Sequence, residues 1–235
     1  MNGLKPSNWL ERVNCAIEGI LWAARTQLHL RYHLVAAVGV LLLAVFFRIS
    51  TLEFILLTFA VTLVIFAELI NTALEVVVDM VSPEFHPLAR RAKDVAAGAV
   101  LASSIGTVVI GYMALSRFLF PSIAHGLNLL GRPAGELPVV AVLVVIIAVV
   151  LLKALFGRGT PLHGGMPSGH AAVAFSVATS IALSQVAPLI ILLVLVLAAM
   201  VSHSRLLLGI HTLKEVLSGA LLGAGLTFIL YLMFA

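Results

Sequence analysis

The amino-acid sequence predicts an all-α protein, a polytopic membrane helical bundle of about seven transmembrane helices with a further N-terminal helix at the membrane interface. Of its 235 residues, 62% are hydrophobic and 10% are charged, whereas soluble domains average about 45–50% and about 25%. Seven spans of about 20 residues need roughly 140 residues, so the chain accommodates six to eight spans joined by short loops. This count leaves no room within the sequence for a large soluble domain.

Composition also excludes several kinds of site. The one cysteine, Cys15, allows no internal disulfide and no thiolate zinc cluster. The formal net charge of +4 is too thinly spread for a nucleic-acid surface, so no nucleic-acid partner is expected. Charged side chains interrupt the first thirty residues, which therefore do not form a signal peptide. With Trp9 and Trp22 as anchors, this segment predicts a helix lying at the membrane surface.

Apolar runs predict the spans in order, with ends placed to within about 2–4 residues. The expected spans are 33–48, 52–80, 95–119, 137–156, 169–185, 187–202 and 212–234. A stretch rich in glycine and proline, crossed by no long apolar run, separates the third span from the fourth. We therefore expect a three-span domain over residues 1–120, a linker over 121–136 and a four-span domain over 137–235.

The placement of lysine and arginine predicts a cytoplasmic N-terminus. With this orientation the outside segments hold Arg48, Arg117 and Arg132, which leaves 11 of the 14 basic residues inside. The positive-inside rule expects this asymmetry. Counting spans from this end places the two polar clusters described below on the cytoplasmic face.

The first polar cluster is an acidic stripe on the second predicted span. At 100° per residue, Glu75 and Asp79 lie within about 20° of Glu68 around the helix axis, and Asn71 lies about 60° away. An acid at the bilayer centre costs about 2.5–3.5 kcal/mol on insertion scales, so three on one stripe are expensive unless they have a function.

The segment that follows, residues 82–94, is expected to bring basic and acidic side chains to the same membrane face. These are Arg90, Arg91, Lys93 and Asp94. Carboxylates with an amide suit Mg²⁺, which is bound by oxygen and shared with substrate phosphates. A lysine beside them suits phosphoryl transfer, whose transition state requires charge stabilisation. The alternative is that the acids only pair with these basic residues and hold the helices together.

These motifs resemble the prokaryotic diacylglycerol/undecaprenol kinase family over residues ~10–120. The matching segments are Glu68-Leu-Ile-Asn71-Thr-Ala-Leu-Glu75-Val-Val-Val-Asp79, His86-Pro87 and Ala92-Lys93-Asp94. The resemblance implies a surface helix and three spans per protomer, assembly as a homotrimer, and phosphorylation of a membrane lipid hydroxyl with ATP and Mg²⁺.

The family's functional residues carry over onto this stripe and the segment after it. Glu68 would be the general base on the lipid hydroxyl, and Glu75 would be a Mg²⁺ ligand. Asn71, Lys93 and Asp94 would belong to the site that binds the nucleotide phosphates.

One position departs from the family. A second metal-binding glutamate usually lies on the surface helix, and a gapless alignment back from Glu68 places Gln27 there. Glutamine keeps an oxygen ligand for the metal but loses the negative charge, so metal affinity should fall. We therefore expect a kinase site that is weakened, retuned or inactive.

The second polar cluster begins after the fourth span and continues around the end of the sixth. Residues 153–170 contain five glycines, which permit close backbone approach to a ligand. Ser168 then opens a helix whose first free N–H groups favour an anion. His211 and Glu215 stand at i and i+4 on one face of the last helix, where a carboxylate can fix the tautomer of an imidazole.

These residue types allow phosphoester hydrolysis by a histidine nucleophile. Three cations, Lys153, Arg158 and Arg205, would hold the phosphate while a second imidazole protonates the leaving alkoxide. A single histidine is equally well an ordinary interfacial side chain, and we interpret His163 and His203 in this way.

This half resembles the type 2 phosphatidic acid phosphatase superfamily over residues ~137–234. The matching pieces are Lys153 with Arg158, the Pro167-Ser168-Gly169-His170 signature, and Ser204-Arg205 followed by His211. The resemblance implies that His211 is the nucleophile, oriented by Glu215, and that His170 is the general acid. The implied phosphate-binding residues are Lys153, Arg158, Ser168, Gly169 and Arg205. No cofactor is expected for this domain.

Three features depart from that superfamily. Seven residues after the lysine it commonly has Arg-Pro, whereas this chain has Thr160-Pro161 with Arg158 nearby. The partner of the nucleophile is usually aspartate, and here it is Glu215. The domain also has four predicted helices instead of the usual six.

The sequence as a whole predicts a fusion of a lipid kinase module and a lipid phosphate phosphatase module in a bacterial cytoplasmic membrane. Its expected partners are a membrane lipid substrate, ATP and further copies of the chain. Alternatives are a phosphatase whose kinase-like half is only a trimerising anchor, a transporter with an intramembrane ion relay, and a non-catalytic assembly subunit. Broken helices or repeated halves would favour transport, and the sequence shows neither.

Overall fold

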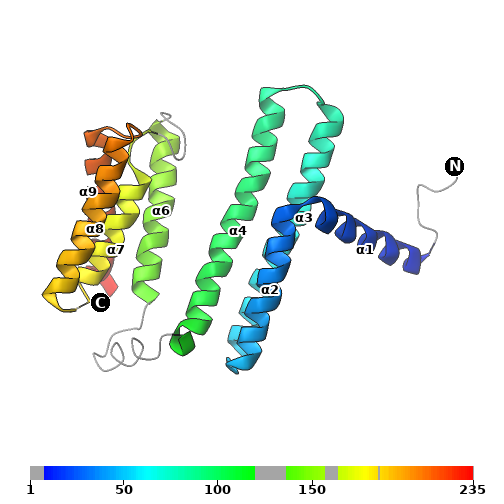
Figure 1. Ribbon diagram of the computed structural model, residues 1–235, viewed down its shortest axis with the longest axis horizontal. Helices are drawn as coiled ribbons and strands as arrows, with labels where there is room; N and C mark the ends of the chain where they lie inside the picture. The colour runs from blue at the N-terminus through cyan, green and yellow to red at the C-terminus, as the bar shows by residue number, and fades with distance from the viewer. Residues whose placement is uncertain (1–7, 120–135, 157–163, 185, 235) are drawn as a thin grey trace. The chain divides into compact units, whose positions relative to one another are not determined.

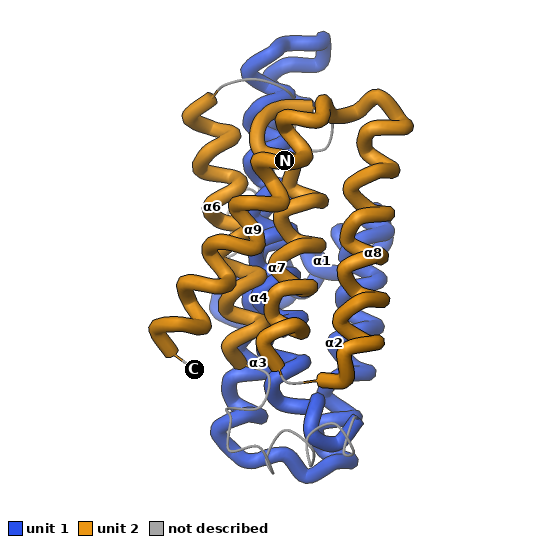
Figure 2. Tube along the Cα trace, turned by 90° about the vertical axis from the view of Figure 1, so that its left-hand side faces the viewer, with its two compact units in different colours: residues 1–123 blue, residues 124–235 orange. Residues whose placement is uncertain are grey.

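The computed structural model describes residues 8–119, 136–156, 164–184 and 186–234, in which all regular structure is helical (Figure 1). The helices are α1 (Trp9–Thr26), α2 (Leu28–Phe46), α3 (Thr51–Val81), α4 (Pro87–Leu119), α6 (Glu136–Phe156), α7 (Gly169–Ala182), α8 (Pro188–Leu207) and α9 (Leu213–Phe234). They divide between two compact units, residues 1–123 and 124–235, coloured separately in Figure 2. Of the expected linker 121–136, only Glu136 lies within the described residues.

Among the described helices, six are long and apolar enough to cross a bilayer, which confirms the predicted polytopic helical fold. They are α2, α3, α4, α6, α8 and α9. The expected span 169–185 corresponds to α7, which has 14 residues. At 1.5 Å per residue α7 is about 21 Å long, shorter than the roughly 30 Å hydrocarbon core.

Capping at its N-terminus and a backbone break at its C-terminus delimit α1. The Asn8 side chain accepts a hydrogen bond of 2.9 Å from the backbone N–H of Glu11, which satisfies one free donor of the first turn. Gln27 has extended backbone angles and separates α1 from α2. In Figure 1, α1 leaves the longer helices of its unit at a steep angle, with Trp9 and Trp22 exposed. This is the geometry expected of a helix lying along a membrane surface.

The hairpin of α3 and α4 is longer than the bilayer is thick. With 31 and 33 residues, the two helices extend about 46 Å and 50 Å, against a hydrocarbon core of roughly 30 Å. Lys93 and Asp94 belong to the segment 82–94 expected between two spans, but in the structure they lie within α4, which already begins at Pro87. Proline is favoured as a first helical residue because its missing N–H is not needed there. Lys93 and Asp94 therefore lie about two turns into a regular helix.

An ion pair joins the other end of this hairpin. Ser50 and Glu53 form a capping box at the start of α3. The same Glu53 carboxylate accepts a 2.6 Å hydrogen bond from Arg117, near the end of α4. These contacts hold α3 and α4 in a defined register, which in turn sets which residues meet at their opposite ends.

In the second unit, α7 packs closely against α9 because both helices present small residues. A Cβ atom at Gly219 would collide with the backbone of Ser168, and one at Gly223 would collide with the backbone of Ala172. Glycine at these two positions lets the helix backbones approach, as in other small-residue contacts between membrane helices. The contact fixes the start of α7 against the start of α9.

Candidate active sites

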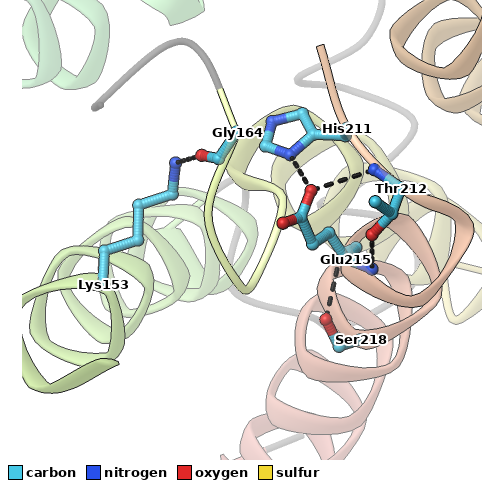
Figure 3. A network of polar contacts seen from close by, with 6 residues as sticks. All are labelled: Lys153, Gly164, His211, Thr212, Glu215 and Ser218. Atoms are coloured by element: carbon cyan, nitrogen blue, oxygen red, sulfur yellow. Dashed lines mark hydrogen bonds and ion pairs between the residues drawn. The ribbon is translucent and has the colours of Figure 1, made fainter. Parts of the chain in front are cut away.

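At one end of the second unit, residues 164–168 form a loop that leads into α7 (Figure 3). The Lys153 ammonium group, near the end of α6, donates a 3.1 Å hydrogen bond to the carbonyl of Gly164. Gly164 and Gly165 have φ values of 73° and 82°, a region that residues with a side chain rarely adopt. The two glycines therefore permit the turn that leads into Ser168 and α7.

Glu215, in the first turn of α9, ties this loop to the histidine of the same cluster. Its backbone carbonyl accepts a 2.9 Å hydrogen bond from the N–H of Ser168. One carboxylate oxygen lies 3.0 Å from His211 Nδ1 and also accepts a 2.9 Å bond from the N–H of Thr212 (Figure 3). The backbone N–H of Glu215 in turn donates to the Thr212 hydroxyl at 3.4 Å. Glu215 therefore positions both the imidazole and the start of α7.

The reciprocal contacts of Thr212 and Glu215 are those of a capping box, a threonine followed three residues later by glutamate. Sequence reasoning identified Glu215 but missed Thr212, although this spacing was a readable signal. The capping box also gives a physical reason for glutamate where aspartate is usual. The longer side chain reaches back to the Thr212 N–H and to His211 at once.

The His211 side chain is only 1% exposed. With Nδ1 directed at the Glu215 carboxylate, the proton belongs on Nδ1 and the lone pair is on Nε2. A turn at the end of α8 brings this imidazole to the site, because the Arg205 carbonyl accepts hydrogen bonds from the N–H groups of Ile210 and His211 at 3.1 and 3.2 Å. His211 thus has the tautomer and the position that a nucleophile requires.

His170 is the second residue of α7 and faces the same cluster. It lies close enough to Lys153, Arg205 and His211 for their charges to act on its imidazole. Arg205 is held in part by its own neighbour, since its Nε donates to the Ser204 hydroxyl at 3.2 Å. Two imidazoles and two cations therefore converge where α6, α7, α8 and α9 meet.

The Ser168 hydroxyl shows that this convergence suits an anion. Ser168 is fully buried, and its Oγ has no hydrogen-bond partner among the described residues. It does not cap α7 through its side chain either. A buried hydroxyl without a partner is costly, and a phosphate oxygen at the α7 N-terminus would satisfy both the hydroxyl and the free helix N–H groups.

The structure brings together seven of the side chains and glycines expected at this site. They are Lys153, Ser168, Gly169, His170, Arg205, His211 and Glu215. Arg158 and His163 lie outside the described residues. His203 is exposed on α8, where the sequence analysis expected an interfacial side chain.

In the first unit, Glu68 is buried against α2. Only 4% of it is exposed, and its Oε1 lies 3.1 Å from His33 Nε2. A buried carboxylate requires a hydrogen-bonding or charged partner, and His33 supplies one. Sequence reasoning missed His33. The available signal was a histidine at the beginning of an apolar span that precedes a span with an acidic stripe.

One turn further along α3, Asn71 and Glu75 contact each other. The Asn71 amide donates a 3.1 Å hydrogen bond to Glu75, while its carbonyl oxygen is buried without a partner in the described part of the chain. Adjacent carboxylate and amide oxygens are ligands that Mg²⁺ accepts, together with substrate phosphates. No group of three or more His, Cys, Asp or Glu side chains within the described ranges could hold a metal alone. Gln27 lies at the break between α1 and α2.

Four more charged residues of the expected cluster lie near the turn between α3 and α4. Asp79 pairs with Lys93 of α4, and Asp94 pairs with Arg90 at 3.9 Å. All four line a cavity of about 420 Å³, within the range of small-molecule sites. Asp79 thus joins α3 to α4, as expected if the acids only pair with basic residues and hold the helices together. Glu68 and Asn71 make other contacts.

Comparison with known proteins identifies both halves of the chain. The family model for prokaryotic diacylglycerol kinase matches residues 14–115, and that for the PAP2 superfamily matches residues 134–235. The undecaprenol kinase of Bacillus subtilis is 36% identical over 95 residues, which cover 40% of this chain and 77% of that protein. The chain belongs to the prokaryotic diacylglycerol kinase family. Its second half is a PAP2 superfamily domain.

Two further relatives are named as diacylglycerol kinases. The diacylglycerol kinase of Synechocystis is 39% identical over 105 residues, or 44% of this chain and 60% of that protein. The diacylglycerol kinase of Escherichia coli is 36% identical over 75 residues, or 32% of this chain and 62% of that protein. No solved structure matches the chain. The predicted fusion of a membrane lipid kinase domain with a phosphatase superfamily domain is thereby confirmed.

Proposed function

We propose that the protein modifies membrane lipids at two sites. The PAP2 domain hydrolyses a lipid phosphate or pyrophosphate through a phosphohistidine, and the kinase domain phosphorylates a lipid hydroxyl with MgATP. The observation that carries the phosphatase proposal is the buried His211–Glu215 pair beside Ser168, whose buried hydroxyl has no partner among the described residues. The names of the relatives suggest diacylglycerol or undecaprenol as the lipid alcohol.

In the phosphatase reaction, His211 Nε2 attacks the phosphorus atom and forms a P–N bond while the P–O bond to the lipid breaks. The Lys153 ammonium, the Arg205 guanidinium and the N-terminus of α7 stabilise the negative charge of the phosphoryl oxygens. His170 protonates the leaving oxygen, so the lipid departs as an alcohol or a monophosphate. Water then cleaves the P–N bond, releases inorganic phosphate and restores His211.

In the kinase reaction, Glu68 removes the proton from the lipid hydroxyl as its oxygen bonds to the γ-phosphorus atom of ATP, while the bond from that phosphorus to the β–γ bridging oxygen breaks and ADP leaves. His33 holds the Glu68 carboxylate in place. Asn71 and Glu75, with Gln27, would hold Mg²⁺, whose charge would screen the phosphate oxygens when it is bound. Lys93 would stabilise the transferring phosphoryl group.

A lipid panel tests both activities and the role of Gln27. Purified protein is incubated with diacylglycerol, undecaprenol and their mono- and diphosphates, and labelling from ATP and phosphate release are measured separately. We expect phosphate release to persist in EDTA and labelling to require Mg²⁺. Gln27→Glu should lower the Mg²⁺ concentration for half-maximal labelling, because it restores a negative ligand. Gln27→Met, of similar size but without a side-chain oxygen, should raise it.

The alternative of an inert anchor makes the opposite prediction. If neither the wild type nor Gln27→Glu labels any lipid at high Mg²⁺, the kinase-like half is not a kinase. The homotrimer implied by the family resemblance belongs to both interpretations, so oligomeric state does not separate them.

We also propose that the N-terminus is cytoplasmic and that both sites open to the cytoplasm of a bacterial cell. The distribution of basic residues, 11 inside against 3 outside, supports this orientation. In a Cys15→Ser background, Gly131→Cys should react with a membrane-impermeant thiol reagent on intact cells, whereas Gly159→Cys should react only after lysis. The reverse pattern would show that the orientation is inverted.

A further inference from the structure

We propose that a groove between α6, α7 and α8 binds the hydrocarbon chain of the phosphatase substrate and accommodates one chain, not two. This inference rests on the proposed phosphatase function and adds the class of substrate that the site prefers. The groove has a volume of about 470 Å³ and is lined by apolar residues that include Val150, Val173, Ala174 and Val201. His170 is the one polar side chain among the described residues that line it.

His170 connects the groove to the reacting atoms. Its imidazole belongs to the cluster of Lys153, Arg205 and His211 and also lines the groove. As the general acid it must contact the leaving oxygen, and in a single-chain lipid monophosphate that oxygen is bonded to the first carbon of the chain. The chain therefore starts at His170, where the groove starts, while the phosphate lies on the side of His211.

Gly169 keeps the entrance to the groove open. A Cβ atom at this position would lie 3.4 Å from the Val149 side chain, so any larger side chain would press against α6 where the two helices border the groove. Glycine thus serves two purposes in the signature that precedes His170. It exposes the backbone N–H groups at the α7 N-terminus to phosphate, and it leaves room for the chain.

The groove is open rather than enclosed, and its volume sets how much of a lipid can lie within it. An apolar cavity of about 150 Å³ binds benzene, with six carbons, so a groove of about 470 Å³ accommodates about 18 carbons. That corresponds to one acyl chain or a few prenyl units. An α-helix of a second protein chain, about 10–12 Å across, is too wide to enter. We therefore infer a preference for single-chain lipid phosphates.

A series of straight-chain alkyl phosphates, used below their micelle concentrations, tests this inference. For the wild type we expect kcat/KM to rise by up to about fourfold per added methylene, because each methylene leaves water for the groove. In Ala174→Phe the phenyl ring fills the groove, so the rise should stop at short chains while butyl phosphate is still hydrolysed. Val177→Phe is the matched control, since Val177 is an exposed residue of the same helix that does not line the groove.

The outcomes separate the groove from the chemistry. An unchanged chain-length dependence in Ala174→Phe, with butyl phosphate still hydrolysed, would overturn the inference and leave the phosphatase intact. If the wild type hydrolyses none of these esters, the phosphatase proposal fails for this class of substrate. The groove is then tested by binding, because dodecyl phosphate should raise the Tm of the wild type more than that of Ala174→Phe. Equal shifts in Tm for the two proteins would overturn the inference that the groove binds the chain.

Discussion

The His211→Ala protein is expected to release phosphate from its lipid substrate at least about 10⁴-fold more slowly than the wild type. The effect is large because the substitution removes the atom that forms the P–N bond, and no other described side chain has the same buried position next to Glu215. The measurement is phosphate release in EDTA, with kcat determined at saturating lipid. Retention of most of the activity would show that another group is the nucleophile.

Replacing Glu215 provides a graded comparison with the loss of His211. Both contacts, with His211 and with Thr212, use one Glu215 oxygen, which the amide oxygen of glutamine can replace. Glu215→Gln does remove the negative charge that favours the proton on His211 Nδ1. We expect a loss one to two orders of magnitude smaller than that of His211→Ala, because the charge beside the imidazole is removed and the atom that forms the P–N bond is not. Glu215→Asp keeps the charge, but its side chain is too short to reach both partners. Its phosphatase activity should lie between that of Glu215→Gln and that of the wild type.

The second large effect is expected for Glu68→Gln, which should lower the kcat for lipid labelling by about 10²- to 10⁴-fold. Gln has nearly the same shape and can still contact His33, but it cannot take the proton from the lipid hydroxyl. The KM for ATP should change little, since Glu68 is not expected to bind the nucleotide. The measurement is transfer of label from ATP at saturating Mg²⁺.

The His211→Ala and Glu68→Gln proteins are controls for each other, because the two sites belong to one chain but to different units. His211→Ala should keep the labelling activity of the wild type, and Glu68→Gln should keep its phosphatase activity. Glu53→Gln is a further control on α3, about 22 Å along the helix from Glu68. Loss of labelling in Glu53→Gln equal to that in Glu68→Gln would indicate that the hairpin has been disturbed, and would contradict a specific role for Glu68.

Much of the fold and of the phosphatase site could be predicted from the sequence, since helix length and residue spacing are local properties. The long apolar runs predicted the six long helices. The i, i+4 spacing predicted that His211 and Glu215 would meet on one helix face. They do meet, but α9 begins only at Leu213, so the contact forms because Glu215 reaches back from the first turn of the helix. The proline at position 87 was also a local signal, and it could have shown that Lys93 and Asp94 lie on a helix.

Only the tertiary structure decided which helix faces meet. It showed that Glu68 lies against His33, that Asp79 pairs with Lys93, and that α7 is short and packed on the glycines of α9. In a soluble protein the apolar face of a helix would have indicated the buried side. Lipid tails are as apolar as leucine, so the sequence of a membrane helix does not distinguish the side that faces lipid from the side that faces protein. The partners of the buried polar groups, and the groove beside His170, therefore emerged only when the helices were packed together.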